Sequence, residues 1–360
     1  MSKVFSDVLT IVNGKNQRAV ENPNGKYPIY GSGGIMGYAD NYLCDAETVI
    51  IGRKGSINKP IFVEEPFWNV DTAFGLVANK TVLLPKYLFY FCVNYDFEKL
   101  NKTVTIPSLT KSDLLKIEID IPSIIIQQSV VEKLDRVGNC IELLKMQLNK
   151  LDELIKSRFG EMFGDMITNP CEWNRDKLGK VCDVRDGTHD SPSYYDEGYP
   201  LVTSKNVTNG SINFSDCNYI CEADFNKINE RSKVDIGDIL MPMIGTIGKP
   251  VIVKTDKPFA IKNVALVKFY PKGLVENVYI HTILKSDYFD RMVISKIRGG
   301  TQKFIALGDI RELTISIPPI ELQNQFADFV TKVERQKVIV QQSIEKLETL
   351  KKSLMQEYFG

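Results

Sequence analysis

The segment GRKGSINKP, residues 52–60, carries side chains that can bind phosphates or the edges of nucleic-acid bases: Arg53, Lys54, Ser56, Asn58 and Lys59. In the major groove arginine can pair with guanine and asparagine with adenine, and lysine can neutralise a phosphate. The same composition is also found in a basic surface turn between two strands. We predict a DNA-contacting loop here and keep the surface turn as the alternative.

Three further stretches have comparable polar donors. YGSGG (30–34) contains Ser32 and VTSKN (202–206) is its later counterpart, while MIGTIGKP (243–250) is the later counterpart of residues 53–60. The candidate donors in the later copies are Ser204, Lys205, Asn206, Thr246 and Lys249. Because the later copies differ from the earlier ones, any base reading must differ between them.

Residues 291–303 contain basic side chains and no acidic one, and their last part belongs to IRGGTQKF (297–304). Glycine lets a backbone approach a phosphate closely, and basic side chains neutralise it. The candidate contacts are Arg298, Thr301, Gln302 and Lys303. Taken alone, such a run is also typical of a solvated face.

His189, in GTHDSPSYYDEG (187–198), is beside Asp190, a pair that could perform acid–base chemistry. No nucleophile with an arranged base accompanies it, so a polar recognition loop is the better interpretation, and His281 is interpreted as structural. The chain has no Asn-Pro-Pro-Tyr/Phe motif of adenine methyltransferases and no GxxxxGK[ST] phosphate loop. We expect no catalytic residue, metal site or cofactor in this chain.

Composition limits the possible classes of protein. The 360 residues are 43% hydrophobic, enough for two domains, and Lys+Arg and Asp+Glu are both 45. A neutral chain is unusual for a DNA-binding protein, so affinity must come from local patches or partner subunits. Without an apolar run of about 20 residues or a signal-peptide pattern, and with seven scattered cysteines, we expect a cytoplasmic protein with free thiols and no membrane contact.

An internal repeat organises the chain. LNKLDELIKSRFGEMFG (148–164) matches IEKLETLKKSLMQEYFG (344–360), and the register holds back to Pro122 and Pro318. Upstream the match weakens: ETVIIGRKGSINKPIFV (47–63) aligns with GDILMPMIGTIGKPVIV (237–253), and VLTIVNG (8–14) with VCDVRDG (181–187). Similar helices with diverged globular parts suggest one scaffold that carries two different binding surfaces.

Both repeat ends show an apolar heptad pattern typical of paired helices. The first seam runs from Val130 to Ile155, and the second follows the same track from Phe326, with lysines in place of apolar residues at Lys337 and, beyond Leu347, at Lys351. Antiparallel pairing of the seams would separate the globular parts by the length of a helix, about 54 Å at about 1.5 Å per residue. Homodimerisation through the same seams is the alternative.

We therefore predict an α+β fold with two mixed, strand-rich domains, separated by two long antiparallel coiled-coil helices in a pseudo-twofold arrangement. The predicted boundaries are 1–122 for the first domain, 123–164 for the first helix, 165–317 for the second domain and 318–360 for the second helix. Short strands are expected at TVIIG, PIFVEE, DILMPMIG and KPVIVKT, and helices at 85–98 and 277–291.

This doubled arrangement resembles the specificity subunit of Type I restriction-modification systems. The resemblance rests on SRFGEMFG and EYFG at the helix ends, on the GDIL and GTIGKP motifs, and on RGGTQKFIALGDIRELTISIPP. It covers nearly the whole chain, although the first copy lacks the Trp-containing segment CEWNRDKLG (171–179).

The resemblance implies two target-recognition domains that each read half of a split site in double-stranded DNA, and helices that set the spacer. It implies as partners two methyltransferase subunits and restriction subunits, which hold S-adenosylmethionine, ATP and Mg²⁺. The alternatives are a coiled-coil scaffold whose domains bind protein or carbohydrate, and a self-sufficient restriction enzyme, against which the missing motifs argue.

Overall fold

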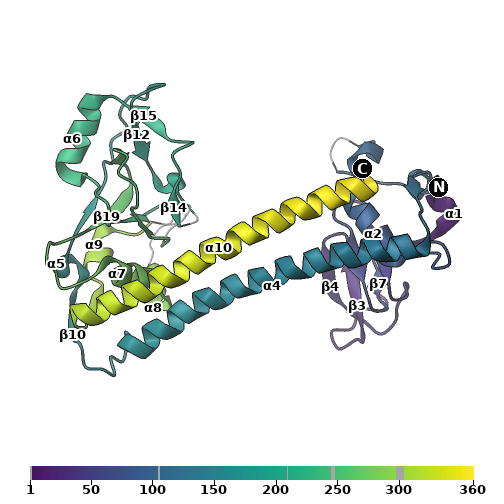
Figure 1. Ribbon diagram of the computed structural model, residues 1–360, viewed down its shortest axis with the longest axis horizontal. Coiled ribbons are helices and arrows are strands. Elements are labelled where there is room, and N and C mark those ends of the chain that lie inside the picture. The colour runs from purple at the N-terminus through teal and green to yellow at the C-terminus, as the bar shows by residue number, and fades with distance from the viewer. Residues whose placement is uncertain (1, 104–105, 209, 245–247, 297–303) are drawn as a thin grey trace. The chain divides into compact units, whose positions relative to one another are not determined.

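The computed structural model describes residues 2–103, 106–208, 210–244, 248–296 and 304–360 (Figure 1). It divides into two compact units. The first unit is Met1–Gln147 with Val340–Gly360, and the second unit is Leu148–Ile339. The division passes through both long helices, α4 (Ile124–Phe163) and α10 (Ile320–Phe359), so each unit contains part of each helix.

The first unit consists of small sheets packed on helices. Its strands are β1 (Ser2–Val4), β2 (Leu9–Asn13), β3 (Tyr27–Gly31), β4 (Gly34–Ala39), β5 (Thr48–Gly52), β6 (Ile61–Val63), β7 (Trp68–Asn69), β8 (Ala73–Ala78) and β9 (Glu118–Asp120). Its shorter helices are α1 (Phe5–Val8), α2 (Pro85–Asn94), η1 (Phe97–Leu100) and α3 (Lys111–Leu114). The strands form a four-stranded sheet of order β2-β8-β5-β6, a three-stranded sheet β4-β3-β7 and the pair β1-β9.

The second unit repeats this topology. Its strands are β10 (Asn174–Lys177), β11 (Cys182–Asp186), β12 (Tyr199–Val202), β13 (Val207–Thr208), β14 (Ser211–Ile212), β15 (Asn218–Ile220), β16 (Ile239–Pro242), β17 (Val251–Ile252), β18 (Ala260–Ile261), β19 (Val264–Phe269) and β20 (Thr314–Ile317). Its helices are α5 (Leu178–Val181), η2 (Ser204–Asn206), α6 (Glu222–Ser232), α7 (Asn277–Leu284), α8 (Asp287–Met292), η3 (Ile294–Lys296) and α9 (Leu307–Arg311). Sheets β11-β19-β16-β17 and β15-β12-β18 and the pair β10-β20 correspond to those of the first unit.

The pair β1-β9 settles how the first globular part opens. Ser2–Val4 pairs antiparallel with Glu118–Asp120, as Asn174–Lys177 pairs with Thr314–Ile317. The pair β1-β9 is therefore the counterpart of β10-β20. Trp173 itself donates from its indole N–H to the Phe163 carbonyl at 3.1 Å, which ties the end of α4 to the segment that follows.

The predicted strands form around buried β-branched residues. In β5 all five residues are buried, because β8 and β6 flank it on both sides and α2 packs nearby. An edge strand such as β4 leaves Ile35, Met36 and Tyr38 exposed instead. Burial on both faces gives β5 its continuous apolar sequence, whereas a one-sided strand would alternate.

Two helix predictions were too long. The helix that starts at Pro85 ends at Asn94, and a separate turn of 3-10 helix follows at Phe97–Leu100, where Asp96 accepts from the backbone N–H of Glu98. The expected helix over 277–291 is two helices, because α7 ends at Leu284 and α8 begins at Asp287. In both places a residue with an extended backbone interrupts the helix, Tyr95 after α2 and Ser286 between α7 and α8.

The heptad seams pair antiparallel within each unit, as predicted. In the first unit Lys133 Nζ lies 3.3 Å from Tyr358 Oη, and Lys145 Nζ lies 3.3 Å from Glu348 Oε1. In the second unit Phe159 packs edge-on against Phe326 at a centroid distance of 5.5 Å. A higher number on α4 meets a lower number on α10, which is the signature of opposite directions.

Lys337, which interrupts the second seam, is accommodated by ion pairs. Its Nζ lies 2.8 Å from Asp152 Oδ1 on α4 and 3.0 Å from Glu334 Oε1 on its own helix. These carboxylates raise the pKa of the half-buried Lys337 despite the desolvation that opposes them. A paired lysine at a seam position therefore stays charged and helps to fix the register of the two helices.

A buried glutamine attaches each long helix to its globular part. Gln127 Nε2 donates to the carbonyls of Val82 at 2.8 Å and Pro122 at 2.9 Å, and its Oε1 accepts from the Leu84 N–H at 2.8 Å. Gln323 makes the same three bonds to Leu274, Pro318 and Glu276, at 3.0, 2.8 and 2.9 Å. Both side chains are fully buried, so their amides satisfy backbone groups that water cannot reach.

None of the helices in the described parts of the chain combines the length and apolarity needed to cross a membrane. All seven cysteines are unpaired.

Substituting Gln127 by alanine should lower the free energy of unfolding by about 2–4 kcal/mol, because it leaves buried backbone groups without partners. The matched control is Gln128→Ala, since Gln128 is exposed and its one side-chain bond among the described residues goes to Glu132 on the same helix. Urea denaturation measures both variants. Equal stabilities of the two variants would show that the buried amide does not hold the helix.

Candidate nucleic-acid interface

In the first unit, two of the predicted contact loops lie side by side. Ser32 is in the turn between β3 and β4, and Arg53 begins the loop between β5 and β6. A methyl group added to Gly55 would lie 3.9 Å from Ser32 Oγ, and one added to Gly52 would lie 3.0 Å from Ser32 Cβ. The structure therefore brings Ser32 together with Arg53, Lys54 and Ser56.

Backbone hydrogen bonds hold this pair of loops. The N–H groups of Arg53 and Lys54 both donate to the Thr72 carbonyl, at 2.8 and 3.2 Å, and the Gly55 N–H donates to Pro107 at 3.0 Å. The Arg53 guanidinium lies over the Phe74 ring at 5.8 Å. Both basic side chains are exposed and have no ion pair within the described residues, so their charges remain available on a fixed backbone.

Asn58 is positioned differently from its neighbours. Its Oδ1 accepts from the Phe97 N–H at 2.7 Å, and its Nδ2 donates to Asp96 Oδ1 at 3.0 Å. This bond from Asn58, with one from the Glu98 N–H, lowers the pKa of Asp96. The amide thus anchors the loop beside the buried Ile57, and contact with a base would require it to leave these partners. Lys59 is exposed at the end of the loop.

In the second unit, the loops that follow β11, β12 and β18 meet around Asn263. Ser204 Oγ donates to the Asn263 carbonyl at 3.2 Å, and the Asn263 N–H donates to the Thr188 carbonyl at 3.2 Å. The His189 ring lies with Nδ1 at 2.8 Å from Asn263 Oδ1. His189 and Ser204, predicted separately, therefore belong to one cluster.

Lys205 and Asn206, adjacent in sequence, have different surroundings. Asn206 is buried, and its Oδ1 accepts from the Thr203 N–H at 3.0 Å and the Thr203 hydroxyl at 2.9 Å. Lys205 is exposed, without an ion pair among the described residues. Asn206 shapes the turn that presents Lys205, and its own contact with DNA stays a prediction.

Of the remaining predicted contact residues, the structure describes Lys249. Thr246, Arg298, Thr301, Gln302 and Lys303 lie outside the described residues. Lys249 is exposed and precedes Pro250, whose carbonyl accepts from His281 Nε2 at 3.0 Å. Burial lowers the pKa of His281 to about 4, so this histidine is a neutral packing residue, in line with the structural role expected of it.

Three cluster residues were missed from the sequence. Asp186, on β11, is 7% exposed and accepts from His189 Nε2 at 2.9 Å, and it also pairs with Arg231 on α6. Asn263 has a φ of 55°, a left-handed conformation that asparagine tolerates. Arg231 and Asn263 are distant from His189 in sequence and have no motif, so only the tertiary structure associates them.

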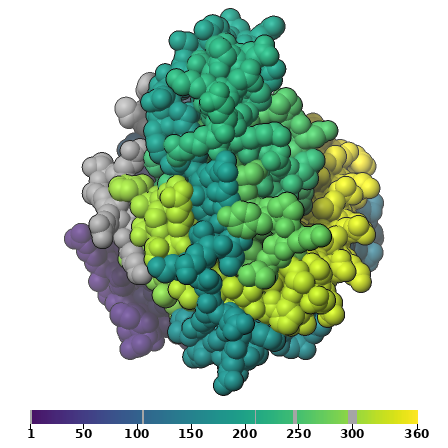
Figure 2. Space-filling model, turned by 90° about the vertical axis from the view of Figure 1, so that its left-hand side faces the viewer, coloured from purple at the N-terminus to yellow at the C-terminus, as the bar shows by residue number. Residues whose placement is uncertain are grey.

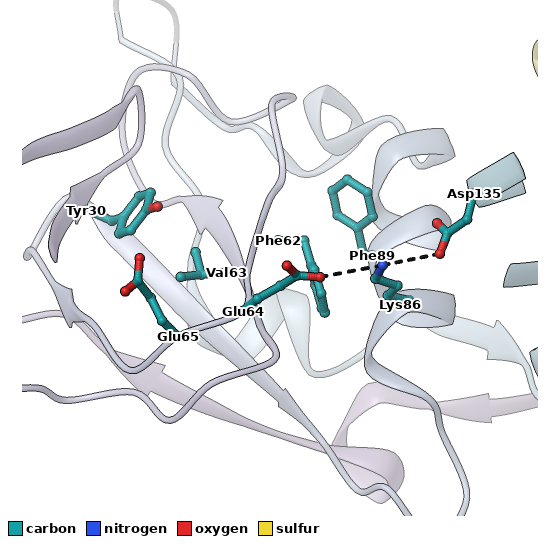
Figure 3. A pocket seen from close by; sticks show the side chains of 8 residues that line it. All are labelled: Tyr30, Phe62, Val63, Glu64, Glu65, Lys86, Phe89 and Asp135. Atoms are coloured by element: carbon teal, nitrogen blue, oxygen red, sulfur yellow. Dashed lines mark hydrogen bonds and ion pairs between the residues drawn. The ribbon is translucent and has the colours of Figure 1, made fainter. Parts of the chain in front are cut away.

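A separate hollow of the first unit has the wrong charge for nucleic acid (Figure 3). Its volume is about 470 Å³ and it is lined by Tyr30, Phe62, Val63, Glu64, Glu65, Lys86, Phe89 and Asp135. Lys86 Nζ lies 3.5 Å from Glu64 and 3.2 Å from Asp135, so the one lysine in the lining is already paired. The excess of carboxylates would repel phosphates, which favours the Ser32 and Arg53 loops as the DNA-contacting surface of this unit.

In Figure 2 the segments around α6 and β15 form the upper part of the view. Arg231 belongs to α6 and Asp186 to β11, so the ion pair between them joins the three-stranded and four-stranded sheet regions of this unit. The cluster around Asn263 thus stands on elements that are tied to one another rather than on an isolated loop.

Comparisons with known proteins agree on one family. The family model described as Type I restriction modification DNA specificity domain matches residues 2–153 and 170–349. A Haemophilus influenzae protein described as a type I restriction enzyme specificity subunit is 25% identical over 355 residues, covering 92% of this chain and 87% of that protein. The MjaVIII specificity subunit of Methanocaldococcus jannaschii is 23% identical over 331 residues, covering 86% and 75%.

A solved structure shares the fold. The S subunit of a Type I restriction-modification system from M. genitalium is similar with a TM-score of 0.64, at 15% identity, covering 100% of this chain and 96% of that one. At this identity the likeness concerns the fold alone.

Replacing Asn206 by alanine should lower the free energy of unfolding by about 1–2 kcal/mol, because the cap of the turn is lost. Lys205→Ala, one residue away, should leave stability within about 0.5 kcal/mol, as expected of an exposed side chain. Thermal unfolding of both full-length variants measures the difference. A destabilised Lys205 variant with an unchanged Asn206 variant would contradict the roles assigned to them.

Proposed function

This chain belongs to the Type I restriction modification DNA specificity family, and on that premise we propose that it is the DNA-reading subunit of a Type I restriction-modification complex. Each unit reads one half of a bipartite, asymmetric site in double-stranded DNA. The chain selects the target, and partner subunits perform the chemistry.

The observation that carries this proposal is one topology with two different sets of exposed loops. The sheets β4-β3-β7 and β15-β12-β18 correspond strand by strand. In the first unit the turn after β3 places Ser32 beside Arg53 and Lys54. In the second unit the turn after β12 places Ser204 beside His189 and Asn263. The turns after β3 and β12 are equivalent, but the loops that meet them carry different donors, as two unlike half-sites require.

Local charge supports DNA contact in a neutral chain. Lys268 and Lys86 are used internally, since Lys268 Nζ lies 2.6 Å from Asp238 and 2.9 Å from Asp235, and Lys86 bonds to Asp135. Arg53, Lys54 and Lys205 have no ion pair among the described residues. The unpaired charges of Arg53, Lys54 and Lys205 add positive potential at the loops where phosphates would bind.

The long helices supply the second part of the proposal. We infer that α4 and α10 set the spacer between the half-sites and that their exposed surfaces bind two methyltransferase subunits. Large apolar side chains off the seam support this, namely Leu143 and Met146 in the first unit, and Val338 and Ile339 in the second, which are 54–64% exposed. Exposed apolar side chains grouped on a helix are typical of an interaction surface.

Partners and compartment follow from the same premise. The methyltransferase subunits would bind S-adenosylmethionine and methylate adenine, and restriction subunits would use ATP and Mg²⁺. The chain lacks the methyltransferase and phosphate-loop motifs that such chemistry needs, which supports a non-catalytic role. The complex would act in the cytoplasm, where the unpaired cysteines stay reduced.

Arg53→Glu with Lys54→Glu should lower the affinity of the assembled complex for its site by about 10-fold to 1,000-fold, through lost phosphate or base contacts and added repulsion. The site is first identified by mapping methylated adenines in cells that express the complex. Lys80→Glu is the matched control, because Lys80 is an exposed lysine of the same unit that pairs with Glu47. Equal binding by both variants would show that these loops do not contact the DNA.

Deleting residues 141–147 and 344–350 together should shorten the tolerated spacer by about three base pairs. One heptad removed from each helix shortens the rod by about 10 Å, at about 1.5 Å per residue, and keeps the seam in register. These segments face one another, as the ion pair Lys145–Glu348 shows. Methylation mapping reads the new spacer. An unchanged spacer with active methylation would disprove the role of the helices as a ruler. Loss of both half-sites would show that recognition by the globular parts depends on the length of the helices.

A further inference from the structure

The His189 ring lies between two oxygen atoms. Its Nε2 is 2.9 Å from Asp186 Oδ2, and its Nδ1 is 2.8 Å from Asn263 Oδ1. With an oxygen facing each ring nitrogen, both nitrogens must donate to keep the two hydrogen bonds, and imidazole donates from both only when it is protonated. The Asn263 Oδ1 is then occupied, and the Nδ2 of the same amide has no hydrogen-bond partner among the described residues.

The charged groups that face His189 come from two elements. Asp186, on β11, accepts from the ring, and Arg231, on α6, pairs with the other oxygen of Asp186. Asp186 is almost completely buried and holds both cations. The hydrogen bonds that the ring donates to Asn263 and to Asp186 raise the pKa of His189 above its ordinary value of 6.5, against the opposing effects of partial burial and Arg231.

The backbone of Asn263 is fixed, so only its side-chain amide can turn. The Asn263 N–H donates to the Thr188 carbonyl at 3.2 Å, and its carbonyl accepts from Ser204 at 3.2 Å. The residue has a φ of 55°, as in a tight turn, and it is half-buried. Rotation about the last side-chain bond exchanges Oδ1 and Nδ2 without moving the chain.

Loss of one proton forces that exchange. When His189 becomes neutral, the remaining N–H stays on Nε2, because a bare nitrogen facing the Asp186 carboxylate would leave two acceptors in contact. Nδ1 then becomes an acceptor, and Asn263 can keep its hydrogen bond only by turning Nδ2 toward it. The amide oxygen then occupies the outward position that Nδ2 held before.

We propose that protonation of His189 selects the hydrogen-bonding group that Asn263 presents to the second half-site, an N–H donor when the ring is charged and an oxygen acceptor when it is neutral. This inference rests on the proposed function of the second unit as a DNA reader. The donor form suits purine N7, guanine O6 or thymine O4, and the acceptor form suits the amino groups of adenine or cytosine. Asn263 becomes a specificity-determining residue and His189 the residue that positions it.

The first experiment needs no DNA. The chain has two histidines, and His281 is buried with a pKa of about 4, so a histidine titration by ¹⁵N NMR near neutral pH reports His189 alone. We expect Nδ1 to lose its proton, Nε2 to keep its proton, and the Asn263 side-chain amide signal to shift with the same midpoint. A neutral ring protonated on Nδ1, or an Asn263 amide that does not respond, would overturn the proposal.

The second experiment measures base preference. Binding of the complex with its methyltransferase subunits is compared for the mapped site and for single-base changes in the half-site read by the second unit, from about pH 6 to about pH 8.5. For the wild type we expect the preferred base at one position to change by about five- to tenfold in relative affinity, the effect of one hydrogen bond.

Two variants separate the amide from the charge. N263D presents an acceptor at every pH and should keep the high-pH preference throughout, and N263G, which also tolerates the left-handed backbone, should lose the preference at that position. Sequence-selective binding whose base preference does not change with pH would overturn this inference alone. Absence of sequence-selective binding at any pH would instead overturn the proposed function, while the NMR titration still decides whether the amide turns.

Discussion

A buried amide in the first turn of each long helix is the constraint on which the rest of the structure depends. Gln127 and Gln323 each bond to a carbonyl before the helix and to an N–H and a carbonyl in the segment that leads into α2 or α7. These bonds lie in places that water does not reach, so neither the helix nor the globular part can shift without leaving polar groups unpaired. The direction in which each helix leaves its domain, and hence the side that its apolar seam presents, follows from this attachment.

The seam then requires a partner. A 40-residue helix with an apolar stripe has no way to bury it alone, and in each unit the stripe of α4 meets that of α10 running in the opposite direction. Lys337 is tolerated at a seam position because Asp152 lies opposite, which makes the charge a determinant of register rather than a defect. The core of each globular part extends into this pairing: Val130 and Leu134 join one core, and Phe159 and Phe326 join the other.

Duplication followed by divergence explains how one scaffold obtains two surfaces. Three sheets and the glutamine attachments recur in both units, whereas the side chains at the loop ends are different. Where the first unit has Phe89 and Glu64 in an acidic hollow, the second buries His281 against the Pro250 carbonyl. Residues that hold the strands together must meet the same packing requirements in both copies. Exposed loop residues have no such shared requirement, so the loops can differ.

Much of the architecture could be predicted from the sequence, because it depends on local and periodic patterns. The heptad spacing predicted both long helices, the β-branched runs predicted β5 and β16, and the repeat predicted matching topologies. Helix ends were less predictable: the amphipathic pattern continues past Asn94 and Leu284, but the backbone becomes extended at Tyr95 and at Ser286.

The functional cluster needed the tertiary structure. The sequence by itself identified Ser32, Arg53, His189 and Lys205 as polar residues on loops, because composition marks exposed donors. It could not show that Asn58 and Asn206 use their amides to hold the chain, since a hydrogen bond to a distant or local backbone group leaves no sequence pattern. Nor could it bring Asp186, Arg231 and Asn263 to His189 from three separate elements. Periodicity encodes which face of an element is buried, but only the folded chain decides which loop ends meet, and the chemistry of this site depends on that meeting.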